Sequence, residues 1–104
     1  MGRNRALGQA TVAMLNAMER GARFGLEIMD ATGLPSGTVY PTLTRLEKRG
    51  LVKGRWENEN VAQKEGRPRR RYYRITPDGR RLHYEALAKL GLLVAVRSLR
   101  VRQP

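Results

Sequence analysis

The fold is decided by residues 36–52, which have the sequence SGTVYPTLTRLEKRGLV. The apolar side chains in the first part of this stretch recur at spacings of three and four, which predicts an amphipathic helix. They are Val39, Leu43 and Leu46. Ser36 is a favourable N-cap residue and Gly50 a favourable terminator, so we predict a helix over residues 36–50. From Leu51 onward the pattern changes to period two, which is typical of a strand.

Two further helices are predicted before this one. The first 21 residues carry apolar side chains on one helical face, with Asn4 as the N-cap and Gly21 as the stop. A second helix is predicted over residues 24–32, and Gly33 ends it. Only a few residues then precede Ser36, and two helices joined by so short a turn indicate a helix-turn-helix.

A β-hairpin is predicted after the third helix. Residues 51–56 suit one strand, and residues 69–76, rich in Tyr and Ile, suit an antiparallel partner. The polar segment 57–68 joins them, with the tip at residues 63–68, and it is too long for a two-residue turn. A basic hairpin directly after a helix-turn-helix is called a wing.

Alternation along the second strand divides its arginines between two faces. Arg70 shares a face with Tyr72, whereas Arg69 and Arg71 share the other with Tyr73. The second face holds the better core candidates, so we expect Arg69 or Arg71 to turn back towards the protein.

The sequence TPDG at residues 76–79 opens a last helix. Thr76 suits the N-cap, Pro77 the first helical position, and Asp78 the positive end of the helix dipole. The apolar surface that follows exceeds what packing on so small a core needs, so we predict a dimer contact. Its candidate residues are Leu7, Leu82, Ala86, Leu87, Leu90, Leu93 and Val94.

The charge of the chain indicates a polyanionic partner. Lys and Arg total 21 against nine Asp and Glu, a formal net charge of +12 over 104 residues. Residues 61–81 hold eight basic and two acidic side chains, so half of the net charge lies in and near the wing. The simplest alternative is a basic segment that binds any polyanion.

Composition excludes several other classes of protein. The chain has no cysteine, which excludes disulfides and thiolate metal sites and favours a reducing cytoplasm. No apolar run approaches the ~20 residues of a membrane-spanning helix, and the N-terminus lacks a secretory signal. The acidic residues are scattered, and we find no nucleophile, metal set or phosphate loop, so we expect neither an enzyme nor a cofactor.

Several stretches, taken in order, resemble the PadR-type transcriptional regulators. They are FGLEI at 24–28, GTVYPTLTRLE at 37–47, GLV at 50–52, GRP at 66–68, YYRIT at 72–76 and Gly79. The resemblance covers about residues 12–82 and implies a dimeric winged helix-turn-helix that usually represses transcription, in a short form with one C-terminal helix. Some relatives bind aromatic or phenolic effectors near the dimer interface. Here no aromatic residue follows Tyr84, so the sequence identifies no effector.

We therefore predict a mainly α-helical protein with a small β-hairpin, in the winged helix-turn-helix order α-α-α-β-β-α. Residues 1–76 are assigned to DNA binding, with the wing at about 57–70, and residues 77–104 to a dimerisation helix and tail. The expected function is sequence-specific binding of double-stranded DNA as a homodimeric repressor in the cytoplasm, associated with the nucleoid.

The predicted DNA contacts come from the outer side of the third helix and from the wing. The helix would enter the major groove, where Arg45 can bridge two acceptors of guanine, and wing cations would contact phosphates or the minor groove. The candidates are Ser36, Gly37, Thr38, Tyr40, Pro41, Thr44, Arg45, Lys48, Lys64, Arg67, Arg69, Arg70 and Arg71.

Two single residues and two rival functions complete the predictions. Trp56 could be a stacking platform, but a lone strand tryptophan is more often core or dimer packing. His83 has no second ligand candidate nearby and is predicted to lie on the surface. The rivals are a basic RNA-binding or ribosome-associated module and a winged-helix protein-interaction module; exposed aromatic side chains would favour RNA.

Overall fold

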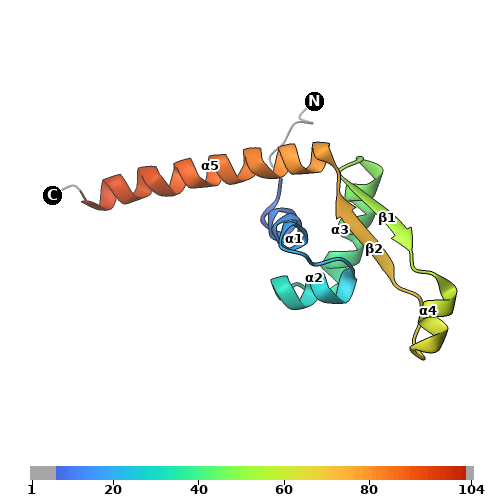
Figure 1. Cartoon of the computed structure of the whole chain (residues 1–104). Coiled ribbons are helices and arrows are strands. Elements are labelled where there is room, and N and C mark those ends of the chain that lie inside the picture. The colour runs from blue at the N-terminus through green and yellow to red at the C-terminus, as the bar shows by residue number, and fades with distance from the viewer. Residues whose placement is uncertain (1–6, 103–104) are drawn as a thin grey trace.

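The computed structural model describes residues 7–102, with side chains up to residue 91. Five helices and two strands follow one another along this part of the chain (Figure 1). Their bounds are α1 Gln9–Glu19, α2 Gly25–Thr32, α3 Ser36–Lys48, β1 Val52–Trp56, α4 Glu59–Lys64, β2 Arg71–Ile75 and α5 Pro77–Arg102. The predicted class, mainly helical with a two-stranded antiparallel hairpin, is confirmed.

The first helix is shorter than predicted. It begins at Gln9 with Gly8 in the N-cap position, and Asn4 lies outside the described residues. The predicted stop is confirmed, because the chain leaves α1 through Gly21, whose φ of 113° is one that L side chains rarely adopt. Met14 and Leu15 on the inner face of α1 are fully buried.

α2 and α3 form the predicted helix-turn-helix. Gly33 ends α2 in the left-handed conformation with φ of 75°, and three residues then separate the two helices. The N-cap of α3 is Pro35 and not Ser36, which is already helical. The reason is that the Pro35 carbonyl accepts the first helical hydrogen bonds, from the amides of Thr38 and Val39 at 3.0 Å.

The hairpin pairs β1 with β2, and Val52 lies opposite Ile75. The Tyr73 amide also donates to the Arg23 carbonyl at 2.8 Å, which ties β2 to the chain just before α2. Two predictions were wrong here. Strand β2 begins at Arg71 and not at residue 69, and the connecting segment contains a short helix, α4. Asn58 caps α4 by accepting a hydrogen bond from the Asn60 amide at 2.8 Å.

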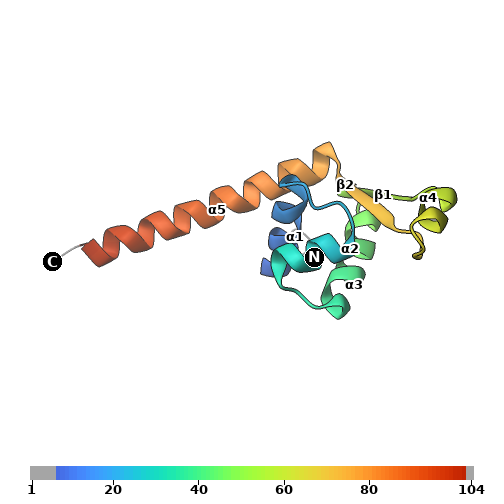
Figure 2. The ribbon, with the colours of Figure 1, turned by 60° about the horizontal axis from the view of Figure 1, so that its bottom comes forward.

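The last helix begins where predicted. The Thr76 hydroxyl accepts a hydrogen bond from the Gly79 amide at 3.1 Å, and Pro77 is the first helical residue. Gly79 is required by a close approach, because a Cβ there would overlap the Leu51 carbonyl oxygen. α5 packs its first turns on α1 and then extends beyond the core, opposite to the wing tip (Figure 2).

One core joins the three N-terminal helices to the hairpin. Its buried members are Met14, Leu15, Met18, Ile28, Val39, Leu43, Leu46, Leu51 and Val52. The core face predicted for the third helix is therefore confirmed. No helix in residues 7–102 is long and apolar enough to cross a membrane.

Two single-residue predictions are corrected by the burial of the side chains. His83 is 1% exposed and not on the surface, because the start of α5 packs against α1 and brings Nδ1 to 3.7 Å from Glu19 Oε2. Trp56, the last residue of β1, is 55% exposed and does not belong to the core, whereas its packing in a dimer stays a prediction.

Candidate nucleic-acid interface

The outer side of α3 is open to solvent, as a helix that enters a DNA groove requires. Its candidate residues are Ser36, Gly37, Tyr40, Pro41, Thr44, Arg45 and Lys48, all exposed, and Thr38, which is half-buried. The opposite side of the same helix is fully buried at Val39 and Leu43. The division of α3 into a core face and a polar face thus follows the sequence pattern. Contact of these residues with DNA stays a prediction.

Tyr40 connects α3 to the start of α2. A Cβ at Gly25, the first residue of α2, would overlap the hydroxyl and ring atoms of Tyr40. The absence of a side chain at Gly25 therefore makes room for the tyrosine, which remains 45% exposed. The ring is supported on one side by α2 and available to a ligand on the other.

Arg45 and Thr44 have contacts within their own helix. Arg45 Nη2 donates to Thr42 Oγ1 at 3.1 Å, and Thr42 is buried. The Thr44 hydroxyl donates to the Tyr40 carbonyl at 3.2 Å, which leaves its lone pairs to accept hydrogen bonds. Arg45 thus keeps free N–H groups while one bond limits the positions of its guanidinium.

Arg71 connects the wing to the C-terminal half of α3. Its Nη2 lies 2.7 Å from Glu47 Oε2, and its guanidinium lies 5.3 Å from the ring centroid of Trp56. A Cβ at Gly54 would come within 2.9 Å of Arg71 Nη2, so the glycine leaves space for the guanidinium on the sheet. The expectation that Arg69 or Arg71 turns back is confirmed for Arg71.

Glu57 organises the base of the wing. This carboxylate is 5% exposed and accepts two hydrogen bonds from Arg67, at 2.7 and 2.9 Å, and one from the Arg70 amide at 3.1 Å. The hydrogen bonds from Arg67, above all, lower the pKa of Glu57 to about 2. Sequence reasoning counted Glu57 among scattered acids because its partner lies ten residues away.

The predicted wing cations therefore differ in their availability. Arg67 is engaged by Glu57, and Arg70 lies 4.2 Å from the Phe24 ring centroid. Arg69 donates from Nε to the Glu57 carbonyl at 3.1 Å but is exposed, as is Lys64 on α4. The most open of these candidates are Lys64 at the end of α4 and Arg69 at the base of the wing.

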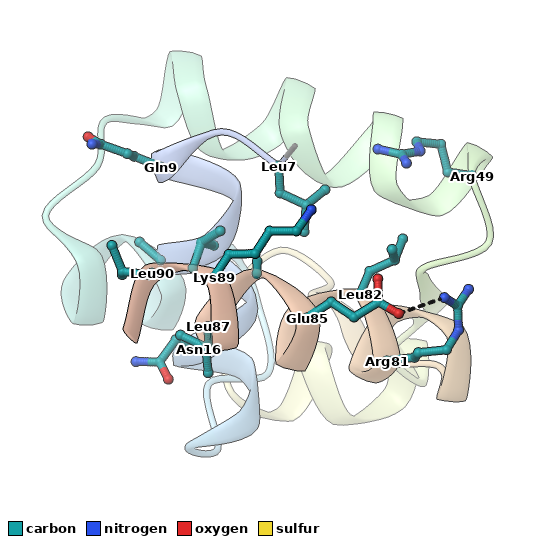
Figure 3. A pocket seen from close by; sticks show the side chains of 13 residues that line it. Leu7, Gln9, Asn16, Arg49, Arg81, Leu82, Glu85, Leu87, Lys89 and Leu90 are labelled. Carbon is teal, nitrogen blue, oxygen red and sulfur yellow. Dashed lines mark hydrogen bonds and ion pairs between the residues drawn. The ribbon is translucent and has the colours of Figure 1, made fainter. Parts of the chain in front are cut away.

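The structure also shows a hollow between α1 and α5 (Figure 3). Its volume is about 870 Å³, and every predicted dimer residue with a described side chain lines it, namely Leu7, Leu82, Ala86, Leu87 and Leu90. Leu87 and Leu90 are 38% and 52% exposed. The side chains of Leu93 and Val94 lie outside the described residues.

Within the described part, no group of three potential metal ligands occurs.

Comparison with protein families identifies the chain. The model of the transcriptional regulator PadR-like family matches residues 14–85, which include α2, α3, the whole hairpin and the start of α5. The chain belongs to the PadR-like family. The predicted family is thereby confirmed, and this PadR-like regulator is a DNA-binding transcriptional regulator by membership.

Solved structures share the fold of this PadR-like regulator. A PadR family transcription regulator from hypervirulent Clostridium difficile R20291 has a TM-score of 0.77 at 24% identity, over 90% of this chain and 99% of that one. A transcriptional regulator from Clostridium thermocellum has a TM-score of 0.68 at 27% identity, over 86% of each chain. A PadR-like transcriptional regulator from Bacillus cereus has a TM-score of 0.71 at 21% identity, over 90% of this chain and 92% of that one. No curated protein matches at a significant level.

Proposed function

We propose that this PadR-like regulator is a homodimer that binds one duplex DNA sequence and represses transcription. We propose that it acts in the cytoplasm, associated with the nucleoid. The observation that carries the proposal is the exposed polar face of α3, backed by the buried face that fixes its orientation. Such a helix can place Arg45 against the acceptors of guanine in a major groove. Repression needs only that the bound protein excludes polymerase, without a further contact surface.

The second copy of the chain would cover the hollow between α1 and α5. Leu87 and Leu90 expose apolar surface there, and α5 extends beyond the core that it starts from. A two-fold axis beside α5 would pack these side chains against their counterparts and place two copies of α3 about 34 Å apart, one helical turn of DNA. The expected operator is therefore roughly palindromic.

The proposed interface separates reading of bases from contact with phosphates. Arg45, Thr44 and Tyr40 supply groups suited to base edges, whereas Lys64 on α4 and Arg69 at the base of the wing are exposed and suit phosphates. Arg67, Arg70 and Arg71 were predicted to contact DNA. Their contacts within the protein suit a different role, which is to hold the wing in position.

The test measures binding of the full chain to its own upstream region, to random duplex DNA and to single-stranded RNA over a salt series. Tight preference for one duplex sequence at physiological salt supports the proposal, whereas equal and steeply salt-dependent binding to every polyanion contradicts it. Arg45→Ala should relax the sequence preference by about 1–3 kcal/mol. Lys64→Ala, the matched loss of one cation, should weaken binding to all duplexes alike.

An RNA-binding function is the second candidate, because Trp56 and Tyr40 are 55% and 45% exposed. Exposed rings are the platforms on which proteins stack unpaired bases. The single-stranded RNA arm of the same experiment decides between the two. Preferred RNA binding that is lost in Trp56→Ala would replace the DNA proposal.

A further inference from the structure

The hairpin has a second basic surface, on the side opposite to Arg71 and Trp56. Residues on this side alternate with those that face α3, and we call it the outer basic face. It consists of Lys53, Arg55, Tyr72 and Arg74 from the two strands, together with Arg23 from the chain before α2. Lys53, Arg55 and Arg74 are exposed. None of these strand residues belonged to the predicted DNA contacts.

The outer basic face carries an electrostatic cost. Lys53 lies directly opposite Arg74 in the register of the strands, and like charges at opposed positions destabilise a hairpin. Within residues 7–91, Lys53, Arg55 and Arg74 take part in no ion pair. The nearby acid, Glu57, is already paired with Arg67. Arg23, by contrast, is paired with Glu27 at 3.4 Å, so the repulsion that remains is that among Lys53, Arg55 and Arg74, which solvent or a bound anion can offset.

The face is also hollowed and aromatic at its centre. It lines a hollow of about 900 Å³, together with Glu57, Asn58 and Val61, the last of which lies on α4. The ring of Tyr72 has two guanidinium groups near it, with Arg55 at 5.2 Å and Arg23 at 5.5 Å from the centroid. These stacked positions hold the cations close to one another around the hollow.

The spacing of these cations matches a nucleic-acid backbone. Lys53 and Arg55 are two residues apart on one strand, a separation of about 6.6 Å. Phosphates of one DNA strand rise by ~3.4 Å along the helix axis but also wind around it, so neighbouring phosphates are about 7 Å apart in space, nearly the same spacing. The DNA bound by α3 would also be held at high local concentration beside this face.

We propose that the outer basic face binds the phosphate backbone of DNA that flanks the segment contacted by α3. This inference rests on the proposed function. The two faces of a β-ribbon point in opposite directions, so duplex lying against α3 and the inner face does not also reach Lys53 and Arg74. The flank reaches them by curving around the wing, and the phosphates then offset the repulsion between the opposed cations.

The test uses two duplexes with the same binding sequence, defined by footprinting of the wild type. One ends at the limits of the footprint, and the other continues for about one and a half helical turns (~15 base pairs) on each side. The wild type should bind the long duplex more tightly. K53Q/R74Q should bind the short duplex as the wild type does and should lose the gain from the flanks. Loss of two phosphate contacts in each protomer, four in the proposed dimer, should reduce the salt dependence on the long duplex, by about a hundredfold in affinity between 50 and 200 mM salt.

Three results would overturn the inference. The wild type could bind both duplexes with equal affinity, K53Q/R74Q could gain as much affinity from the flanks as the wild type does, or K53Q/R74Q could lose the same affinity on both duplexes. A wild type that fails to select the short duplex from random DNA contradicts the proposed function instead. The matched control, R20Q/R80Q, also removes two charges, from exposed positions at the end of α1 and in the first turn of α5, and neither residue lines the hollow between α1 and α5 or the outer basic face. It should keep the gain, and a loss equal to that of K53Q/R74Q would show a general charge effect and overturn the site.

The folding of the variant is checked independently. Thermal unfolding of K53Q/R74Q should occur at or above the temperature of the wild type, because the substitution removes like charges that face each other. Arg55→Gln, which leaves Lys53 and Arg74 in place, provides a second variant and should lose part of the gain. If both variants fold and still bind the long duplex more tightly than the short one by the wild-type factor, the outer basic face is not a DNA site.

Discussion

Glu47 of α3 and Arg71 of β2 form an ion pair, with 2.7 Å between Oε2 and Nη2, across 24 residues of sequence. Through this pair the helix proposed to read bases and the strand that carries the wing share one contact. The two side chains are 34% and 28% exposed, so water weakens their attraction without removing it. The positions of the wing and of α3 are therefore linked by a contact of modest strength.

Arg71→Gln should weaken DNA binding more than it weakens the fold. We expect a loss of about 0.5–1 kcal/mol in unfolding free energy, the range of a partly exposed ion pair, measured by urea denaturation. Glu47→Gln should give the same result, and the double variant should add little to either. Arg80→Gln breaks the pair between α5 and Glu19 of α1, at 3.3 Å, and serves as the control. If the losses of unfolding free energy in the two single variants add up in the double variant, the two side chains are not energetically coupled.

Glu57→Gln should destabilise the wing above acidic pH. The folded pKa of about 2 lies below the ordinary 4.5, so the stabilisation by Glu57 is fully present above pH 4.5 and is lost as the pH falls towards 2. Denaturant unfolding of the wild type and the variant between pH 2 and pH 7 should show a difference that shrinks on acidification. Glu59→Gln, an exposed neighbour on α4, should show a much smaller difference. If the difference in unfolding free energy between Glu57→Gln and the wild type is as large at pH 2 as at pH 7, the charge of Glu57 does not stabilise the wing.

Gly25→Ala should displace Tyr40 from α2. The new methyl group overlaps the tyrosine ring, and we expect a loss of about 1–3 kcal/mol in unfolding free energy, as for other overpacked sites. Adding Tyr40→Ala should recover stability, because the ring is then gone, but should not recover DNA affinity. Gly8→Ala has open space around its Cβ and is the control. Full DNA binding by G25A/Y40A would remove Tyr40 from the proposed interface.

Leu90→Glu should produce monomers. The carboxylate would be buried in the proposed contact between two copies of α5, whereas in the monomer this position is half exposed and tolerates charge. Sedimentation at micromolar concentration measures the result, together with the salt dependence of DNA binding. Ala88→Glu, at an exposed position of the same helix outside the hollow, should leave the assembly unchanged. Identical behaviour of the two variants would place the dimer contact elsewhere.

His83→Leu should stabilise the fold. The imidazole is 1% exposed and neither of its nitrogens has a hydrogen-bond partner among the described residues, so leucine removes two unpaired polar atoms at similar volume. We expect a gain of about 1 kcal/mol by chemical denaturation. Tyr84→Leu at the exposed neighbouring position should change little. Destabilisation by His83→Leu would show that its approach to Glu19 matters.

The parts of the fold that the sequence predicted are those with local signals. Gly33 and Gly50 end helices through backbone conformations that other residues avoid, and Thr76 with Pro77 marks the start of α5. The apolar period of α3 separates its core face from its outer face without reference to the rest of the chain. These features depend on neighbours within about one helical turn.

The parts that the sequence did not predict depend on distant partners. α4 has only six residues and is held between the two ends of the wing, where Glu57 meets Arg67 and Arg70. The burial of His83 depends on the side of α1 that α5 meets, which the period of α5 alone does not specify. Likewise, the sequence predicted that Arg69 or Arg71 turns back but not the partner, which for Arg71 is Glu47 in another element.

The Thr76 hydroxyl makes two contacts, donating to the Gly50 carbonyl at 2.7 Å and accepting from the Gly79 amide. Gly50 follows the last turn of α3, and Gly79 lies in the first turn of α5. One hydroxyl thus links the end of the helix proposed to read DNA to the start of the helix proposed to pair the subunits. If both proposals hold, the distance between two half-sites is encoded at this junction, and a variant selected for a different operator spacing should carry its change there.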